Sequence, residues 1–282
     1  MRKSSGFGVA VVLCLWAAGL VFPAHRVWRS TAALDSKAPP QKAVCISSLN
    51  TDMVTDTARM ARDIDAAGNL GTCDVLLLQE VVRSAGELSV AEQFAKETGR
   101  HAAFASPTGA ETLSGLAILS RYPIRDVETV RLKQFELVYK VRHRLALAAT
   151  IDTPLGPVRV VNTHLDTRIN SGDRVEQLTP VIQHAERFTG PRIIGGDFNT
   201  NNNAWLGHVL PLPFFQIQTA AVRDLMDDYG FQSPFRSTGP THKMFGMRLD
   251  WIYAKQMNAW DAGIERIAFS DHHAIWARFQ LN

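Results

Sequence analysis

Apolar residues recur along this chain with two spacings, and together they predict an α/β fold. Helical spacing marks residues 51–67, 90–98 and 173–187, each closed within a few residues by a glycine. Residues 74–79 contain a continuous apolar run, as expected for a strand that is covered on both faces. The other predicted strands are residues 43–49, 101–105, 115–120, 125–132, 144–151, 158–161, 192–195, 249–254 and 273–280. Strands mixed with helices, including a hairpin, indicate mixed sheets with helices outside.

The N-terminus differs from this pattern. Arg2 and Lys3 precede an uncharged, apolar stretch that runs to residue 24, which is typical of a secretory signal. The stretch is also nearly as long as the roughly 20 residues that span a bilayer, and no clear cleavage site follows it. We therefore expect residues 1–24 to be either a signal peptide or a membrane anchor, residues 25–42 a linker, and residues 43–282 one domain. Both interpretations place that domain outside the cytoplasm, in the periplasm or extracellular space or anchored to the membrane.

The basic charge of the chain belongs to this leader rather than to the domain. The chain has 30 Lys and Arg residues against 27 Asp and Glu residues. Four of the basic residues and none of the acidic ones lie in residues 1–33, so 26 basic residues face 27 acidic ones in the remainder. The composition therefore lacks the strongly basic character of a typical nucleic-acid-binding domain, although this does not exclude a nuclease.

Cys45 and Cys73 are the two cysteines outside the leader, and each begins a predicted strand. In an oxidising compartment they could form a disulfide. Two free, buried cysteines are the alternative, and the Cα separation that decides between them does not follow from the sequence.

Polar residues of catalytic type accompany several of the apolar runs. They occur in residues 46–50, 76–80, 161–164, 193–199 and 270–273. A sixth segment, residues 248–252, places Asp250 inside an apolar stretch. Carboxylates, amides and imidazoles that recur at strand ends usually converge on one site. This set predicts metal-assisted hydrolysis of a phosphate ester.

Glu80 and Asp271 are candidate metal ligands. Mg²⁺ neutralises the charge of a phosphate ester and typically uses one or two carboxylates, with waters and phosphate oxygens completing its shell. Glu80 follows an apolar strand, where an uncompensated buried carboxylate would be costly. A metal ligand is therefore one interpretation of Glu80, and a solvent-facing glutamate is the other. Asp271 offers the metal a second carboxylate.

Asp197 and Asn199 follow two glycines, which let the backbone turn tightly and approach a ligand closely. Because they are two residues apart, their side chains can face the same side. This suits Asp197 as a general base that orients water and Asn199 as a phosphate contact. The alternative is an ordinary Gly-Asp turn.

Asp250 and His272 suit a carboxylate–imidazole pair. The carboxylate favours the imidazolium form, which can hydrogen-bond a phosphate oxygen as charge develops. His164 offers the phosphate another imidazole, although a single histidine at a strand end is more often structural. Arg144 could add a cation, although arginines near a hairpin more often face solvent.

Taken in order, six motifs resemble those of the endonuclease/exonuclease/phosphatase superfamily, which includes pancreatic-type deoxyribonucleases, apurinic endonucleases and sphingomyelinases. The motifs are Asn50, Gln79-Glu80, Asn162-Thr163-His164, Gly196-Asp197-Phe198-Asn199, Asp250 and Ser270-Asp271-His272. The resemblance spans roughly residues 43–282. It implies a four-layer α/β sandwich, in which two packed mixed β-sheets are flanked by helices, and dependence on Mg²⁺ or Mn²⁺.

The resemblance also implies a role for each residue. Glu80 would be the principal metal ligand, helped by Asn50 and Asp271. Asp197 would be the general base. The phosphate contacts would be Asn199, His164 and His272, with Asp250 as the partner of His272.

We therefore expect a monomeric, divalent-metal-dependent hydrolase of phosphate esters. Two substrate classes stay open, nucleic acid and a phospholipid headgroup as in sphingomyelinases. Membrane attachment through the N-terminus would favour the second class if the leader stays attached. A non-enzymatic binding module on the same fold is a further alternative. Its expected mark is a missing acid or histidine, and none is missing here.

Overall fold

The computed structural model describes residues 43–107, 113–135, 143–167, 169–200, 218–236, 239–243 and 246–281. The predicted leader (residues 1–24) and linker (residues 25–42) lie outside the described residues. Within those ranges, no helix combines the length and the apolar character needed to cross a membrane.

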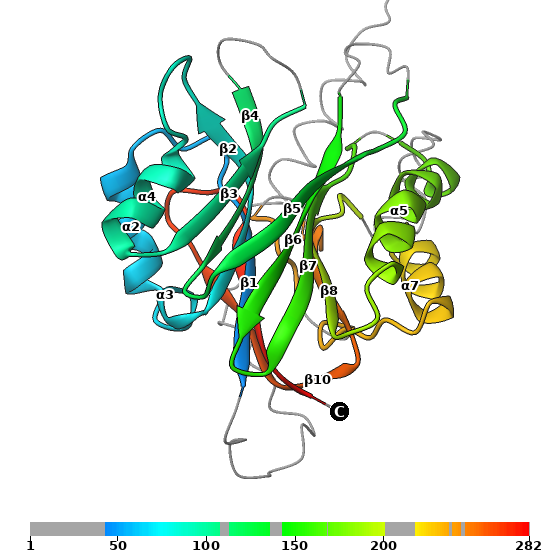
Figure 1. The fold of residues 1–282 in the computed structure, drawn as a ribbon. Coiled ribbons are helices and arrows are strands. Elements are labelled where there is room, and N and C mark those ends of the chain that lie inside the picture. Colours follow the sequence, from blue (N-terminus) through cyan, green and yellow to red (C-terminus); the bar gives the residue numbers. More distant parts are fainter. Residues whose placement is uncertain are drawn as a thin grey trace, which may run out of the picture.

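Two mixed β-sheets pack face to face and form the centre of the domain (Figure 1). In spatial order, the six-stranded sheet consists of β10 (Met257–Arg266), β11 (His273–Leu281), β1 (Val44–Asn50), β2 (Val75–Arg83), β4 (Leu113–Ser120) and β3 (His101–Ala105). The five-stranded sheet consists of β5 (Ile124–Arg131), β6 (Leu145–Thr153), β7 (Gly156–His164), β8 (Arg192–Asp197) and β9 (Asp250–Lys255).

Helices cover the outer face of each sheet (Figure 1). The six-stranded sheet carries α2 (Thr57–Ala66), α3 (Asn69–Thr72) and α4 (Val90–Thr98). The five-stranded sheet carries α5 (Ser171–Glu186) and α7 (Gln218–Asp228). The molecule is therefore a four-layer α/β sandwich, which confirms the predicted fold.

Strand β2 shows why this sequence forms the inner layers. Val75 and Leu77 pack in the cluster between the two sheets, whereas Leu76 and Leu78 pack against the helices on the outer face. All four side chains are buried, and burying each one contributes about 1.5–3 kcal/mol. The continuous apolar run is thus explained by burial on both faces of the sheet.

The predicted helix at residues 51–67 begins six residues later than expected. Asp52 and Met53 have φ angles of 48° and 54°, which a right-handed helix cannot include. The helix starts at Thr57, and the side chain of Asp56 caps it by accepting a hydrogen bond from the backbone N–H of Arg59. The first six residues instead form a turn directly after Asn50.

Three elements, α3, α7 and β10, were not among the predicted ones. Helix α3 has only 4 residues, too few to show a helical spacing. Strand β10 lies at the edge of its sheet and has a register shift between Ala259 and Asp261, which interrupts the alternation of apolar and polar residues. In helix α7, the acidic residues in the second half weaken the apolar spacing. Elsewhere the observed strands agree with the predicted ones to within a few residues.

Cys45 and Cys73 form a disulfide, with their Cα atoms 4.6 Å apart. Cys45 lies in β1, whereas Cys73 caps the C-terminus of α3 and precedes β2 instead of beginning it. Of the two alternatives, the structure therefore contains the bridge, and it ties β1 to the turn that leads into β2.

Gly196 shapes β8 where this strand passes β7. Its φ angle is +141°, and a Cβ atom at this position would overlap the carbonyl oxygen of Thr163 on the neighbouring strand. A side chain here would push β8 away from β7 at the position just before Asp197. Glycine is therefore required for the close approach of these two strands.

We expect Gly196→Ala to destabilise the protein by about 3 kcal/mol or more, because it adds backbone strain to a clash between buried backbone atoms. This corresponds to a melting temperature lower by roughly 6–12 °C in a domain of this size. The measurement is a thermal melt followed by circular dichroism. Gly239→Ala is the control, because a Cβ there would meet no atom within 4 Å. A melting temperature of Gly196→Ala equal to that of the control would contradict the expectation.

Candidate active site

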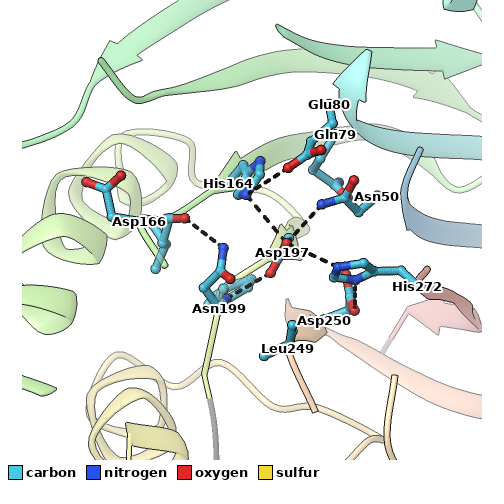
Figure 2. Close-up of polar contacts among 12 residues, drawn as sticks. Asn50, Gln79, Glu80, His164, Asp166, Asp197, Asn199, Leu249, Asp250 and His272 are labelled. Atoms are coloured by element: carbon cyan, nitrogen blue, oxygen red, sulfur yellow. Dashed lines mark hydrogen bonds and ion pairs between the residues drawn. The ribbon is translucent and has the colours of Figure 1, made fainter. Parts of the chain in front are cut away.

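Most of the predicted site residues lie together at one end of the strands of the two sheets, either in paired strands or in the loops directly next to them (Figure 2). His164 ends β7 and pairs with Asp197 at the end of β8, which in turn pairs with Asp250 at the start of β9. In the other sheet, Asn50 ends β1 opposite Gln79 of β2. The site is thus built where β1, β7 and β8 end, beside Gln79 of β2 and the first residue of β9.

Asp197 lies at the centre of this group (Figure 2). Its Oδ2 accepts a hydrogen bond from Asn50 Nδ2 at 3.1 Å, and its Oδ1 accepts one from the backbone N–H of Asn199 at 2.9 Å. The same Oδ2 lies 3.4 Å from His164 Nε2 and 3.8 Å from His272 Nε2. Burial is the main cause that raises the pKa of Asp197, to about 6. A carboxylate with a pKa near neutrality is a stronger base than an ordinary aspartate.

The structure brings His272 and Asp250 together, with His272 Nδ1 2.8 Å from Asp250 Oδ2. Burial acts against the charge on His272, but the charge and hydrogen bond of Asp250, with the charges of Asp197 and Asp271, outweigh it and raise the pKa to about 10. His272 is therefore an imidazolium at neutral pH. Ser270 holds the backbone here, because its hydroxyl accepts from the N–H of His272 and donates to the carbonyl of Asn50.

Glu80 lies at a β-bulge inside β2, not at the end of a strand as predicted. The pairing of β2 with β4 shifts between Leu78 and Val81, and Glu80 has a φ angle of 55°. The bulge directs its side chain to the site, where Oε1 lies 3.9 Å from His164 Nε2 (Figure 2). Its side chain is 26% exposed and points toward His164, so it is only partly open to solvent. Strained residues of this kind cluster at functional sites.

Asn50 has its amide orientation determined by two contacts. Its Oδ1 accepts a hydrogen bond from the backbone N–H of Asp52 at 3.0 Å, while its Nδ2 donates to Asp197. The reversed amide would place two donors against each other at Asp52. A carbonyl oxygen has two lone pairs, so Oδ1 keeps one for a cation.

Asp271 lies on the other side of His272 and is 46% exposed. Its Oδ1 is 3.9 Å from His272 Nε2, and its Oδ2 is 3.2 Å from His242 Nε2. The hydrogen bond from His242 lowers the pKa of Asp271, so this carboxylate is ionised. The two candidate acidic ligands, Glu80 and Asp271, therefore each lie against a different histidine.

The oxygen donors of this site fit a divalent cation such as Mg²⁺. Two compact groups of acids and histidines occur in the described part of the chain, but both include His272. A protonated His272 has no lone pair to give a metal, so in that form it is not itself a ligand in either group. Glu80, Asp271 and Asn50 Oδ1 remain, and Mg²⁺ needs only one or two carboxylates besides waters and substrate oxygens.

Asn199, predicted to contact phosphate, is hydrogen-bonded within the protein. Its φ angle is 50°, and its side-chain Nδ2 donates to the carbonyl of Leu165 at 2.9 Å. Its backbone N–H holds Asp197. In this structure Asn199 therefore ties the loop after β7 to Asp197, and its side-chain amide keeps a second hydrogen besides the one donated to Leu165.

Arg144 is largely buried, whereas arginines near a hairpin usually face solvent. Its Nε lies 3.1 Å from Asp166 Oδ1, and its side chain is 13% exposed. Together with His164 and Ser114 it lines a small pocket beside the site. Asp166 partly neutralises this cation, because the carboxylate contacts it directly. Arg144 thus lies beside His164 and has an acidic partner in Asp166.

Two residues for which the sequence suggested no role connect the sheets beneath the site. Gln79 Nε2 donates to Asn162 Oδ1 at 2.7 Å, and Asn162 Nδ2 donates to the carbonyls of Leu78 and Ala117. Both side chains are fully buried. Because buried amides are costly unless they are paired, this network fixes how the two sheets face each other. The neighbouring motif residues Glu80 and His164 are positioned by it.

Arg174 of α5 is also fully buried and supports the loops of the site. Its Nη1 donates to the carbonyls of Asp166 and Phe198, both at 2.7 Å, and its Nε donates to Gln218. Burial lowers the pKa of Arg174 to about 10, so it is still charged at neutral pH. It joins the loop after β7 to the loop that carries Asn199.

Comparisons with known proteins concern the family and the fold of this chain. The model of the Endonuclease/Exonuclease/phosphatase family matches residues 47–272. Among curated proteins, none matches the sequence. Solved structures with the same fold show how far the likeness extends.

An endonuclease/exonuclease/phosphatase from Beutenbergia cavernae has a TM-score of 0.70 at 21% identity, covering 86% of this chain and 72% of that chain. One from Bacteroides vulgatus has a TM-score of 0.64 at 14% identity, with coverages of 86% and 100%. The human Nocturnin catalytic domain, solved with a bound sulfate anion, has a TM-score of 0.62 at 16% identity, with coverages of 85% and 95%. At these identities the likeness supports the fold alone.

Proposed function

Because this chain belongs to the endonuclease/exonuclease/phosphatase family, we propose that it is a divalent-metal-dependent phosphodiesterase. Enzymes of this family hydrolyse phosphate esters and typically depend on a divalent metal. The observation that carries the proposal is Asp197, a buried carboxylate hydrogen-bonded through both oxygens and lying between the imidazoles of His164 and His272. A base beside two groups that can contact phosphate is the arrangement that hydrolysis needs.

Each residue has a distinct part in this reaction. Asp197 removes a proton from the attacking water, whose oxygen forms the new bond to phosphorus while the bond to the leaving oxygen breaks. The imidazolium of His272 donates a hydrogen bond to a phosphate oxygen, where negative charge develops. His164 contacts the same phosphate from the side of Glu80. The leaving alkoxide takes a proton from solvent, and Asp197 returns its proton to solvent.

Glu80, Asp271 and Asn50 are the residues proposed to hold the cation. When bound, a divalent cation neutralises phosphate charge and polarises its oxygens. The three residues supply oxygen donors, and Glu80 and Asp271 are accessible enough to share a cation with substrate. Support therefore comes from donor chemistry and from exposure.

We also propose that the enzyme acts outside the cytoplasm. The signal-like leader and the Cys45–Cys73 disulfide both support this, because disulfides persist in oxidising compartments. Nucleic acid and a phospholipid headgroup remain the substrate classes to be separated. Attachment to a membrane through residues 1–24 would bring the domain close to lipid.

A substrate panel tests the proposed function. Plasmid DNA, duplex DNA with an abasic site, sphingomyelin and inositol phosphates are each incubated with the protein, in Mg²⁺ or Mn²⁺ and in EDTA. We expect hydrolysis of at least one diester with metal and a loss of more than about 100-fold in EDTA. Hydrolysis that persists in EDTA would exclude the metal mechanism. Inactivity on every ester of the panel with metal present would favour either a phosphate ester outside the panel or a binding module.

A further inference from the structure

A short segment, residues 239–243, lies against the residues that lead into β11. Lys243 N–H donates to the carbonyl of Asp271 at 2.9 Å, and His273 N–H donates to the carbonyl of Thr241 at 2.6 Å. Between these two hydrogen bonds, His242 and His272 lie opposite each other in an isolated antiparallel β-bridge. The backbone of His242 is thus held in register with the imidazolium of the proposed site.

The side chain of His242 contacts two residues of that site. Its Nε2 lies 3.2 Å from Asp271 Oδ2, and its ring meets the ring of His272 edge-on, with centroids 4.9 Å apart at 86°. An ionised carboxylate can only accept hydrogen bonds, so Nε2 of His242 is the donor. His242 therefore links Asp271 to the segment at residues 239–243.

The two oxygens of Asp271 have different surroundings. Oδ2 is taken by His242, whereas Oδ1 lies 3.9 Å from His272 Nε2, on the side of the proposed catalytic residues. The neighbouring cation, Lys243, donates instead to the carbonyls of Ile267 and Ser270. The hydrogen bond from His242 consequently decides which oxygen of Asp271 faces the site.

We propose that His242 is a positioning residue for the metal site, which holds the half-exposed Asp271 carboxylate so that Oδ1 can ligate the cation. This rests on the proposed function, because it takes Asp271 to be a metal ligand. A half-exposed aspartate without a partner would sample several rotamers and would lose rotamer freedom on binding the cation. Hydrogen-bond partners of metal ligands typically change metal affinity by about 10–100-fold when they are replaced.

Three substitutions of His242 separate the hydrogen bond from ring packing. His242→Phe keeps an aromatic edge against His272 but removes the donor. His242→Gln removes the ring but places an amide N–H close to the position of Nε2. His242→Asn carries the same amide on a shorter side chain, which does not reach Asp271 Oδ2.

The test measures Mn²⁺ binding by isothermal titration calorimetry, with no substrate present. We expect His242→Phe and His242→Asn to raise the Kd for Mn²⁺ by about 10–100-fold and His242→Gln to stay within about threefold of wild type. In hydrolysis, the metal concentration for half-maximal activity should rise with the Kd, while kcat at saturating metal changes much less. Equal losses in the Gln and Phe variants would overturn the proposal, because ring packing would then be the cause.

Two further variants keep this test distinct from that of the proposed function. Asp271→Asn should weaken Mn²⁺ binding at least as much as His242→Phe does. If Asp271→Asn weakens Mn²⁺ binding and His242→Phe does not, the role of His242 is wrong and the metal site stands. If neither of these two variants weakens Mn²⁺ binding, the proposed metal site is wrong. His101→Phe is the matched control, because His101 is exposed on β3 and lies away from the site. Its strand partner, Ser120, pairs with Val75, at the end of β2 that is far from Glu80. It should bind Mn²⁺ like wild type.

Discussion

Replacing Asp197 by asparagine should lower kcat for phosphate-ester hydrolysis by about 10³- to 10⁴-fold, the upper range of general base catalysis. Asparagine has nearly the same shape but cannot take a proton from water. It also keeps one oxygen that can accept a hydrogen bond from Asn50 or from the N–H of Asn199. The loss should therefore appear in kcat, measured at saturating metal and substrate, and not in the fold.

The stability of this variant gives a second readout. Burial raises the pKa of Asp197, which means that the folded state disfavours the ionised carboxylate. Above pH 6 the buried charge on Asp197 therefore lowers the free energy of unfolding, and asparagine removes this buried charge. Asparagine also leaves one hydrogen-bond donor unpaired, which costs about 1–3 kcal/mol. Since the two effects oppose each other, the melting temperature should stay within a few degrees of wild type.

Asp152→Asn is the matched control for Asp197→Asn. Asp152 is an exposed residue of β6 that pairs with Arg125, and it lies at the end of the strand remote from the site. Its activity should equal that of wild type. Activity of Asp197→Asn within tenfold of wild type would rule out Asp197 as the base.

Much of the site could be expected from the sequence because strand ends follow from local rules. The apolar runs locate the strands. Parallel neighbours such as β7 and β8 end at the same edge of the sheet, and an antiparallel neighbour such as β9 begins there. His164, Asp197 and Asp250 are each next to such a run, and they are direct neighbours across three strands. Local pattern and topology agree here, so the prediction needed no knowledge of side-chain contacts.

The bulge at Glu80 shows why other features could not be predicted. A bulge exists only relative to a partner strand, and the partner of β2 at this point is β4, more than thirty residues later in the chain. Nothing within residues 75–83 marks the irregularity. The same holds for Arg144, whose burial depends on Asp166 across the following hairpin.

His242 is the clearest case of a residue without a signal in the sequence. It lies in a segment with neither helical nor strand spacing, and it becomes part of the site only by pairing with residues 271–273. The turn at Asp52 and Met53, which shortened α2, is similar, because positive φ angles are uncommon for residues other than glycine. Long-range pairing and local backbone strain are therefore the features of the fold and site that could not be predicted from the sequence.

Replacing His272 by glutamine should lower kcat by about 10²- to 10³-fold, as expected when a donor to a developing oxyanion is weakened. Glutamine keeps a neutral donor but loses the positive charge that Asp250 stabilises. Asp250→Asn should cause a loss of similar size, because asparagine can still accept from Nδ1 but no longer favours the imidazolium. The double variant should be scarcely worse than either single one, since both act through the same charge. Additive losses in steady-state kcat would show that Asp250 and His272 act independently.

The charge on His272 can also be tested without substrate, in metal-free protein. Its pKa in the folded state, about 10, is above the ordinary value of 6.5, so the folded state binds the proton more tightly than the unfolded state does. The stabilisation is complete below about pH 6.5 and is lost as the pH rises toward 10. In EDTA, the melting temperature of wild type should exceed that of His272→Gln most at pH 6, and the difference should shrink steadily up to pH 10. A melting-temperature difference that stays constant over this range would mean that His272 is not held as an imidazolium by Asp250. His272 would then act on a phosphate only as an ordinary imidazole.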